Sequence, residues 1–455
     1  MSLCHQRQWL GSRRQMLQHS SLGFGWMALQ GLLARSSVHA APAGQSSTSR
    51  TAKRVLFLCM RGGPSHVDTF DHKPSLDRDD GKSGPRPGSR LMRSPWSFQR
   101  HGDSGLWISE LFPQLAHHAD KLCMIHSMQT DVPAHPQAMV RLHTGTSQFV
   151  RPSMGAWVLY GLGSANENLP GFVSISPPAN GGASMIGSAF LPAAYQGTRL
   201  GNDGRTFESA TLPNLLSLRS RRTQRQQLDY IQSLNRQKLA QSEGQPEVEG
   251  VIESYELAFR MQSDMPKVLD LGQETKTTLD RYGADQGPTS AFGRKCLLAR
   301  RLLEEGVRFV EITHGNWDQH QQLRNALAGN CRAIDRPIAG LLEDLDSRGM
   351  LEDTLVVWSG EFGRTPYAQG NDGRDHNHKA FTLWMAGGPV RAGFSYGSSG
   401  DHGIEATENP VPVVDFHATL LALLGIDHEQ LTYNHAGRDF RLTDVAGRVL
   451  KEVMA

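Results

Sequence analysis

The chain has 455 residues, 38% of them hydrophobic and 20% charged, and its 47 Lys and Arg against 45 Asp and Glu leave a formal net charge of +2. A charge this close to neutral gives no electrostatic reason to expect nucleic acid or another polyanion as a partner. The five cysteines form no C-x-x-C pair, which excludes a secreted disulfide scaffold and a structural zinc ribbon. Histidine is the unusual count, with 19 residues, and it is the commonest metal ligand and acid–base side chain.

Residues 1–40 are typical of an export signal. Arg13 and Arg14 form a twin-arginine pattern, a modestly apolar stretch follows, and small residues precede a cleavage point after Ala40. A short amphipathic helix is the alternative, but residues 41–53 are rich in Ser, Pro, Gly and Thr and indicate a flexible tether. We therefore expect export through a twin-arginine route to the periplasm or cell surface. No later segment has 18 uninterrupted apolar residues, so no stable membrane span is expected.

Short apolar runs that end in loops predict four buried strands, at residues 54–60, 307–312, 354–358 and 381–386. Helical patterns precede the second and third of these strands, at residues 296–305 and 334–348. Strands that alternate with helices predict an α/β fold, in which helices cover both faces of a parallel sheet. We expect one enlarged domain over residues 54–455.

A change of composition marks a helical insertion at about residues 212–265, which is charged and glutamine-rich. Residues 222–239 and 248–261 predict two long amphipathic helices joined by a polar turn. We expect them to pack as a cap on the α/β core, since the apolar repeat is too short for a coiled-coil partner site. Residues 71–105, rich in Pro, Gly, Ser and Arg, predict an irregular surface loop.

Histidines and acids gather in loops at or near the ends of the predicted strands. In open parallel sheets ligands bind at the carboxyl ends of the strands, so these loops are expected to meet on one rim. The candidate metal ligands are His66, Asp68, His314, Asp318, His320, Glu361, Asp375 and His376. Such a mixed set suits a divalent metal, zinc first, with manganese or calcium as alternatives. For any one of these histidines alone, a surface or hydrogen-bonded loop residue is the favoured interpretation, and Asp68 is equally compatible with the cap of a turn.

Several motifs then carry a family resemblance. Residues 61–71 (RGGPSHVDTFD), 360–366 (GEFGRTP), 373–376 (GRDH) and 436–441 (AGRDFR) resemble the exported bacterial family called domain of unknown function 1501, over nearly all of the chain after the signal. That family is sulfatase-like and belongs to the alkaline-phosphatase superfamily. The resemblance implies an α/β/α sandwich with a mostly parallel sheet. It also implies a site with one or two metals that attacks sulfate or phosphate esters, including sulfated or phosphorylated glycans.

The carry-over of metal ligands from that superfamily is uneven. Sulfatases end a strand of this type in Asp followed by His or Asn, whereas here Glu361 takes the acid position and Phe362 cannot be a ligand. The phosphatase D-x-x-x-H pair resembles residues 314–318 with the residue types reversed, with His320 in addition, and His376 falls where the superfamily places its later histidine. After the first strand, where sulfatases carry acids, the nearby substitutes are His66 and Asp68.

The nucleophile is the largest departure. The sulfatase C/S-x-P-x-R motif is absent around Thr144, and the position nine residues before residues 144–145 holds His135, so a formylglycine sulfatase is not expected. Attack by a metal-activated hydroxide, attack by His135 and loss of hydrolysis all remain open. Ser65 and Thr144 are reserve nucleophiles. Arg364 either holds the anionic group of the substrate or pairs with Asp375.

These observations predict an exported metal-dependent hydrolase of sulfate or phosphate esters, in which His135 and Arg364 act on the substrate. The alternative is a non-catalytic binding protein of the cell envelope that retains the sulfatase-like fold. The sequence does not specify an oligomeric state.

Overall fold

The computed structural model describes residues 51–179, 182–201, 219–241, 246–285 and 287–455. The predicted signal, residues 1–40, and most of the predicted tether, residues 41–53, lie outside the described residues. Residues Ser46–Ala455 form one compact unit.

The core of this unit is a mainly parallel sheet. Its strands lie in the order β12 (Phe394–Tyr396), β4 (Leu122–Gln129), β11 (Phe381–Ala386), β8 (Thr354–Ser359), β1 (Arg54–Met60), β7 (Phe309–His314), β5 (Phe172–Ile175) and β6 (Thr198–Leu200), with β13 (Val411–Pro412) beside β4. All neighbours are parallel except β11, which runs antiparallel to both β4 and β8. The predicted α/β class with a mostly parallel sheet is confirmed.

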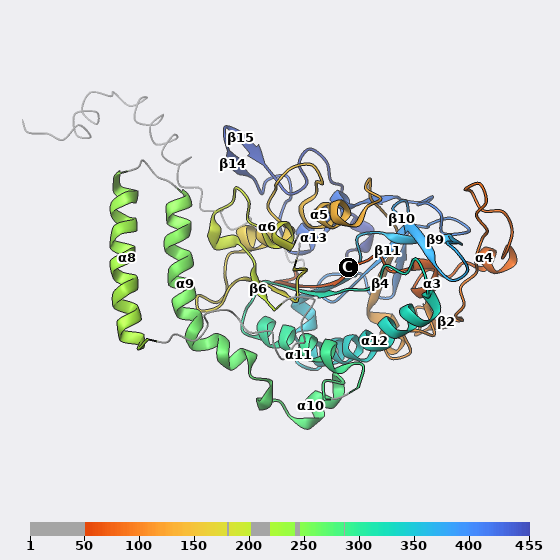
Figure 1. Ribbon diagram of the computed structural model, residues 1–455, viewed down its shortest axis with the longest axis horizontal. Coiled ribbons are helices and arrows are strands. Elements are labelled where there is room, and N and C mark those ends of the chain that lie inside the picture. The colour runs from red at the N-terminus through yellow and green to blue at the C-terminus, as the bar shows by residue number, and fades with distance from the viewer. Residues whose placement is uncertain (1–50, 180–181, 202–218, 242–245, 286) are drawn as a thin grey trace, which may run out of the picture. The chain divides into compact units, whose positions relative to one another are not determined.

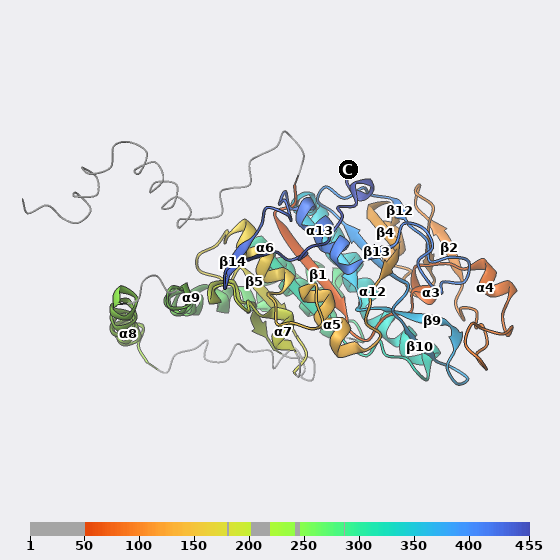
Figure 2. The same ribbon diagram turned by 90° about the horizontal axis from the view of Figure 1, so that it is seen from above.

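Helices cover both faces of the sheet (Figures 1 and 2). On one face lie α11 (Ser290–Glu304) and α12 (Leu323–Ser347), and on the other α5 (His135–Thr144), α6 (Met154–Leu162) and α13 (Val413–Leu423). Because side chains alternate along a strand, β1 sends Leu56 and Leu58 into the first layer and Phe57 and Cys59 into the second. Both layers are therefore closed apolar cores, and polar chemistry is left to the loops and to a few buried groups.

The apolar runs predicted β1, β7, β8 and β11 correctly as strands, but β11 is not parallel. Between β8 and β11 the chain forms a hairpin, β9 (Gly363–Ala368) and β10 (Arg374–Asn377), instead of a crossover helix. A parallel strand needs such a crossover. Because β11 runs in the opposite direction, its carboxyl end at Ala386 points away from the rim at which β1, β7 and β8 end.

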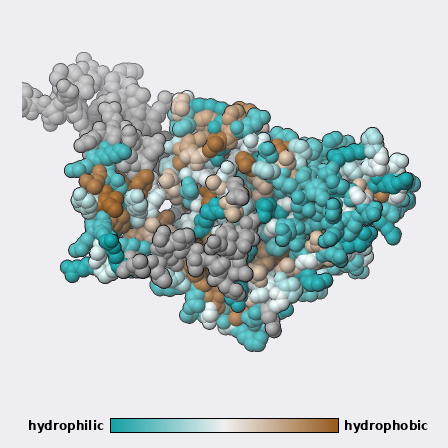
Figure 3. Space-filling model, in the orientation of Figure 1, coloured by the Kyte–Doolittle hydropathy of each residue, from teal (hydrophilic) through white to brown (hydrophobic). Residues whose placement is uncertain are grey.

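Two long helices, α8 (Arg221–Gln241) and α9 (Pro246–Leu269), lie in the segment for which the sequence predicts two amphipathic helices. The Arg225 guanidinium is 2.7 Å from the Glu256 carboxylate and joins the two helices. Exposed Ile231, Leu234 and Val251 belong to this pair of helices, over which Figure 3 shows hydrophobic surface. Within the described ranges, no helix combines the length and apolar character needed to cross a membrane.

Short elements complete the described chain. They are α3 (His66–Thr69), α4 (Pro74–Arg78), α7 (Gly182–Ile186), α10 (Lys276–Arg281), the hairpin β2 (Phe98–His101) with β3 (Leu106–Ser109), and the hairpin β14 (Tyr433–His435) with β15 (Arg438–Phe440). The segment predicted as an irregular loop, residues 71–105, therefore contains α4 and β2.

Candidate metal centre

Four potential metal ligands from distant parts of the chain converge at the carboxyl-end rim of the sheet. His135 is the first residue of α5, Asp318 and His320 lie in the loop after β7, and His376 lies on β10. One ligand atom from each lies within 4.8 Å of all the others. The Asp318 Oδ1 atom is 2.9 Å from His320 Nε2, 3.1 Å from His135 Nε2 and 3.4 Å from His376 Nε2.

The three imidazole rings are held in one orientation by their outer nitrogens. His135 Nδ1 lies 2.6 Å from Glu361 Oε1, His376 Nδ1 lies 2.9 Å from the carbonyl of Pro133, and His320 Nδ1 lies 2.5 Å from Gln369 Oε1. Because these oxygens only accept hydrogen bonds, each Nδ1 carries a proton, and in a neutral ring Nε2 turns its lone pair toward the shared centre. Outer hydrogen bonds of this kind fix the tautomer of metal-binding histidines.

The three inner nitrogens crowd around one shared acceptor, Asp318 Oδ1. His320 Nε2 and His376 Nε2 are only 3.0 Å apart, so their lone pairs oppose each other unless a proton or a metal ion lies between them. His135 Nε2 is buried and makes no hydrogen bond. Burial would lower the pKa of His135, but its hydrogen bond to Glu361 and the charges of Glu361 and Asp318 outweigh burial and raise it. The cluster therefore fits a cation.

Glu361 lies behind His135. Its carboxylate is fully buried and accepts hydrogen bonds from the Gly62 N–H at 2.9 and 3.1 Å in addition to the His135 bond. Gly62 has φ of +120°, and a Cβ there would be 2.7 Å from the backbone nitrogens of Trp317 and Asp318. The close approach of these two loops consequently requires glycine. Glu361, predicted as a ligand, is placed as the group that orients His135.

Arg364 is fully buried on β9, opposite His376 in the β9–β10 ladder. Its guanidinium donates hydrogen bonds to the carbonyls of Gly62, Gly63 (2.9 Å) and Arg374 (3.2 Å), and to Asp318 Oδ1 at 2.5 Å. Burial would raise the pKa of Asp318, but the Arg364 hydrogen bond and charge hold it well below its usual range. The structure thus directs Arg364 at Asp318 and the backbone, and Asp318 stays ionised.

Two candidates from the first strand loop are engaged elsewhere. Asp68 is fully buried and pairs with Arg374, whose Nε and Nη2 donate at 2.6 and 3.0 Å, and with the Ser65 hydroxyl at 2.5 Å. His66 is buried with its Nε2 2.9 Å from the carbonyl of Gly403, and burial lowers its pKa to about 4. The structure does not bring either residue into the four-residue cluster.

Two further candidates also lie outside the cluster. His314, the last residue of β7, accepts a hydrogen bond at Nδ1 from the Trp317 indole at 3.0 Å, and burial lowers its pKa to about 4. Asp375 binds Arg86 at 2.5 Å and the N–H of His376 at 2.8 Å. Of the eight predicted ligands, the cluster therefore contains Asp318, His320 and His376, together with His135.

Some functional neighbours were missed from the sequence. Gln369 and the Pro133 carbonyl orient two of the histidines, and no local pattern distinguishes them because their roles arise from the hairpin and the entry to α5. A second group of potential ligands, Cys59, His143 and Glu311, is buried beneath α5. The sequence signal for this group was Glu311, a carboxylate inside the apolar run of β7.

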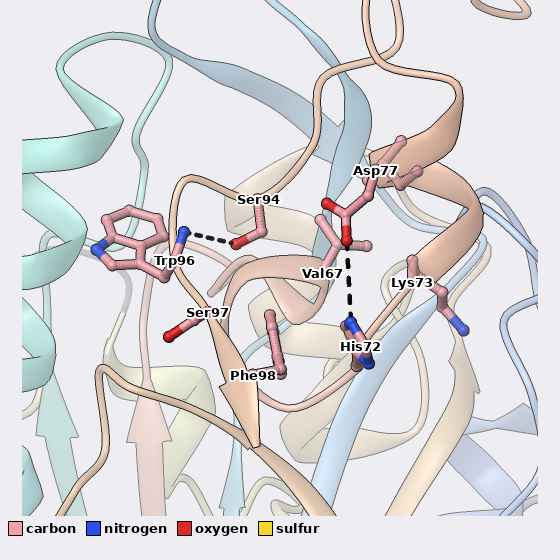
Figure 4. Close-up of a pocket in the computed structure, with 9 residues that line it drawn as sticks. Val67, His72, Lys73, Asp77, Ser94, Trp96, Ser97 and Phe98 are labelled. Carbon is pink, nitrogen blue, oxygen red and sulfur yellow. Dashed lines mark hydrogen bonds and ion pairs between the residues drawn. The ribbon is translucent and has the colours of Figure 1, made fainter. Parts of the chain in front are cut away.

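A separate pocket of about 240 Å³ opens beside α3, α4 and β2 (Figure 4). It is lined by Val67, His72, Lys73, Leu76, Asp77, Ser94, Trp96, Ser97 and Phe98. His72 stacks on Phe98 with ring centroids 5.0 Å apart, and the Lys73 ammonium is paired with Asp71 at 2.8 Å. Its lining shares no residue with the four-residue cluster, so this pocket is distinct from the candidate metal centre.

Residues 52–454 match the family described as Protein of unknown function (DUF1501), and the chain belongs to that family. No sequence among the curated proteins is detectably similar.

Several solved structures are similar to the chain at low identity. A structure of Ps i-CgsB in complex with k-i-k-neocarrahexaose has a TM-score of 0.40 and 13% identity, with 83% of this chain and 72% of that chain covered. The PsFucS1 sulfatase from Pseudoalteromonas sp. has a TM-score of 0.36 and 14% identity, with 89% and 71% covered. The phosphonate monoester hydrolase SpPMH from Silicibacter pomeroyi has a TM-score of 0.39 and 11% identity, with 88% and 76% covered. With scores of this size, these structures are recorded as similarities alone.

Proposed function

We propose that this protein is a metal-dependent hydrolase of sulfate or phosphate esters, in which Asp318, His320 and His376 hold a divalent ion and His135 acts beside it. The observation that carries the proposal is the 3.0 Å approach of the His320 and His376 Nε2 atoms, both of which have their Nδ1 protons committed elsewhere. Zinc suits two imidazoles and a carboxylate, and three protein ligands leave a position open for water or substrate.

A divalent ion at this position supplies Lewis-acid polarisation of an ester oxygen and lowers the pKa of bound water. Asp318 contributes the negative charge that such an ion requires. Arg364 holds the Asp318 carboxylate in place at 2.5 Å. Because every guanidinium nitrogen of Arg364 already donates to protein oxygens, we assign it to positioning Asp318 in place of binding the ester.

His135 is the group we assign to the substrate. Glu361 fixes its Nδ1 proton, so Nε2 is the atom that faces the reacting ester, as a base or as a nucleophile. A buried carboxylate that orients an imidazole in this way stabilises the positive charge that develops on the ring. The absence of the sulfatase nucleophile motif is then compensated by the imidazole at the start of α5.

The test separates metal binding from chemistry. His376→Ala and His320→Ala should each lower the metal content by one ion per chain and abolish all turnover of nitrophenyl sulfate and phosphate esters. His135→Ala should keep the metal, measured by elemental analysis, and lose turnover by a factor of 10² or more. His435→Ala, an exposed histidine on β14, is the matched control. Metal binding without turnover of any ester in the wild type would contradict hydrolysis and leave a binding protein.

We further propose that residues 1–40 direct export through a twin-arginine route and that residues 41–53 tether the domain. The Arg13-Arg14 pair and the small residues before position 41 support this. Replacing both arginines by lysine in the full chain should retain the protein in the cytoplasm. Unchanged fractionation with the cell envelope would contradict the proposal.

A further inference from the structure

Beneath α5 lies a second group of metal-ligand side chains, which the proposed hydrolase site does not use. Cys59 is near the end of β1, Glu311 is inside β7 and His143 is near the end of α5. One potential ligand atom from each lies within 4.8 Å of the others. All three side chains are buried from solvent. We call these three residues the inner cluster.

The sheet itself brings two of them together. β1 and β7 are parallel with Phe57 beside Glu311 and Cys59 beside Thr313, so Cys59 and Glu311 are diagonal neighbours on the face that α5 covers. Diagonal neighbours on one face of a sheet lie close enough for their side chains to meet. His143 reaches the same place from α5, with its Nε2 3.2 Å from Glu311 Oε1.

The hydrogen bonds within the inner cluster are incomplete. His143 Nδ1 faces the Met139 carbonyl at 2.8 Å and therefore donates its proton there. In a neutral ring Nε2 turns a lone pair toward the ionised Glu311 carboxylate, so a proton or a metal ion has to lie between the two groups. Glu311 Oε2 is buried and has no hydrogen-bond partner. Burying a carboxylate oxygen without a partner costs free energy. A bound cation would satisfy both the Glu311 oxygen and the His143 nitrogen.

We propose that Cys59, His143 and Glu311 bind a second divalent cation, zinc by the chemistry of its ligands, which fixes α5 to the sheet. A thiolate and a carboxylate carry two negative charges, so the buried site with a divalent ion is electrically neutral. Mixed sulfur, nitrogen and oxygen ligands suit zinc, whereas calcium and magnesium prefer oxygen alone. The proposal does not depend on the hydrolase function.

Binding forms a bond from the metal to Cys59 Sγ and releases the thiol proton to solvent. In the metal-free protein, burial and the nearby charges of Glu311 and Glu361 raise the pKa of Cys59, so the side chain is then a neutral thiol. Metal binding of this kind couples ligand deprotonation to folding. The inner cluster would hold α5 in place, and α5 carries His135 at its other end.

X-ray absorption at the zinc edge tests the proposal on the zinc-loaded full chain. The inner cluster contributes a sulfur ligand at about 2.3 Å, whereas the four-residue cluster at the rim, which we call the outer cluster, contains no cysteine. The variant His320→Ala/His376→Ala should retain one zinc per chain with this sulfur ligand, because only the outer site is lost. A wild-type spectrum without any sulfur ligand overturns the proposal without requiring any variant to fold.

Zinc content gives the second readout. The wild-type chain should hold two zinc ions, Cys59→Ser one, and Cys123→Ser two. Cys123 is the matched control, because it is a buried thiol on β4 outside the inner cluster. Equal zinc content in Cys59→Ser and the wild type overturns the proposal and leaves a proton shared between His143 and Glu311. Failure of the hydrolase proposal is distinct, since it appears as absent turnover with sulfur-bound zinc retained.

Discussion

Replacing Asp68 by Asn is expected to destabilise the fold while leaving the outer cluster loaded with metal. The sequence made this residue either a metal ligand or the cap of a turn, but the structure pairs it with Arg374 through two hydrogen bonds, at 2.6 and 3.0 Å. Both side chains have no exposed surface. The substitution therefore leaves the Arg374 guanidinium buried without its counter-charge. This costs more free energy of folding than replacing both partners by apolar residues.

Breaking a buried pair by removing one partner costs about 3–5 kcal/mol. The compact unit from Ser46 to Ala455 has roughly 410 residues, and at about 2.1 cal/mol/K per residue its unfolding entropy is near 0.9 kcal/mol/K. The melting temperature of Asp68→Asn should consequently fall by about 4–6 °C. The double variant Asp68→Leu/Arg374→Met should lose less than the sum of the single variants, because no charge remains buried.

Calorimetry and elemental analysis on the same samples check this reasoning. The metal content of Asp68→Asn should equal that of the wild type when both are folded. A variant that melts at the wild-type temperature but loses metal would refute the structural assignment and make Asp68 a ligand. Asp79→Asn is a control for the loss of a carboxylate near the surface, since Asp79 pairs with Lys82 at 2.6 Å outside the core.

Three further perturbations have directions that the structure sets. Glu361→Gln removes the charge facing the His135 Nδ1 proton, so turnover of nitrophenyl esters should fall about 10²-fold while the metal content stays the same. Gly62→Ala places a methyl group 2.7 Å from backbone nitrogen at φ of +120°, so denaturant unfolding should show a loss of about 1–3 kcal/mol. Burial lowers the pKa of His417 to about 4. The unfolded chain therefore binds the proton first on acidification, and this residue alone should cost about 2 kcal/mol of unfolding free energy between pH 7 and pH 5.

Each of these expectations has a clear contrary result. Unchanged ester turnover in Glu361→Gln would show that the carboxylate does not orient the ring, with Glu305→Gln on the surface as the control. A wild-type unfolding curve for Gly62→Ala would mean that the loop relaxes without strain. His417→Gln should flatten the dependence of stability on pH below 6.5, and equal slopes for variant and wild type would contradict the buried neutral imidazole.

The sequence predicted those strands that are continuous apolar runs, because a strand buried on both faces has no room for polar side chains. β4 was missed since His126 and Ser127 interrupt its apolar run. The direction of β11 was also beyond local pattern, because it depends on whether a helix or a hairpin precedes the strand. The connection before a strand sets its direction. The β9–β10 segment has no strong periodicity from which a hairpin could be predicted.

The sequence predicted a site of histidines and acids at the carboxyl ends of the strands, but it did not predict which of these residues lie together. Proximity to the end of β7 grouped His314 with Asp318 and His320, but the His314 ring is taken by the Trp317 indole. The carboxyl ends of parallel strands bring these loops together, but this does not determine which way each side chain turns. His376 and Asp318 were predicted because each stands in a segment of the sequence where histidines and acids gather. The inner cluster was missed because Cys59 and Glu311 are 252 positions apart in the printed sequence and meet only through strand pairing.

The β9–β10 hairpin makes the candidate metal centre sensitive to chain length at one turn. Arg364 and His376 are cross-strand partners, so the residues between Ala368 and Arg374 determine which side chain of β10 arrives beside Asp318. Strand side chains alternate, and insertion of one residue would present Asp375 or Asn377 where His376 now stands. The turn length therefore determines which side chain stands beside Asp318: a change of one residue brings a carboxylate or an amide there, and a change of two residues brings Arg374 or His378.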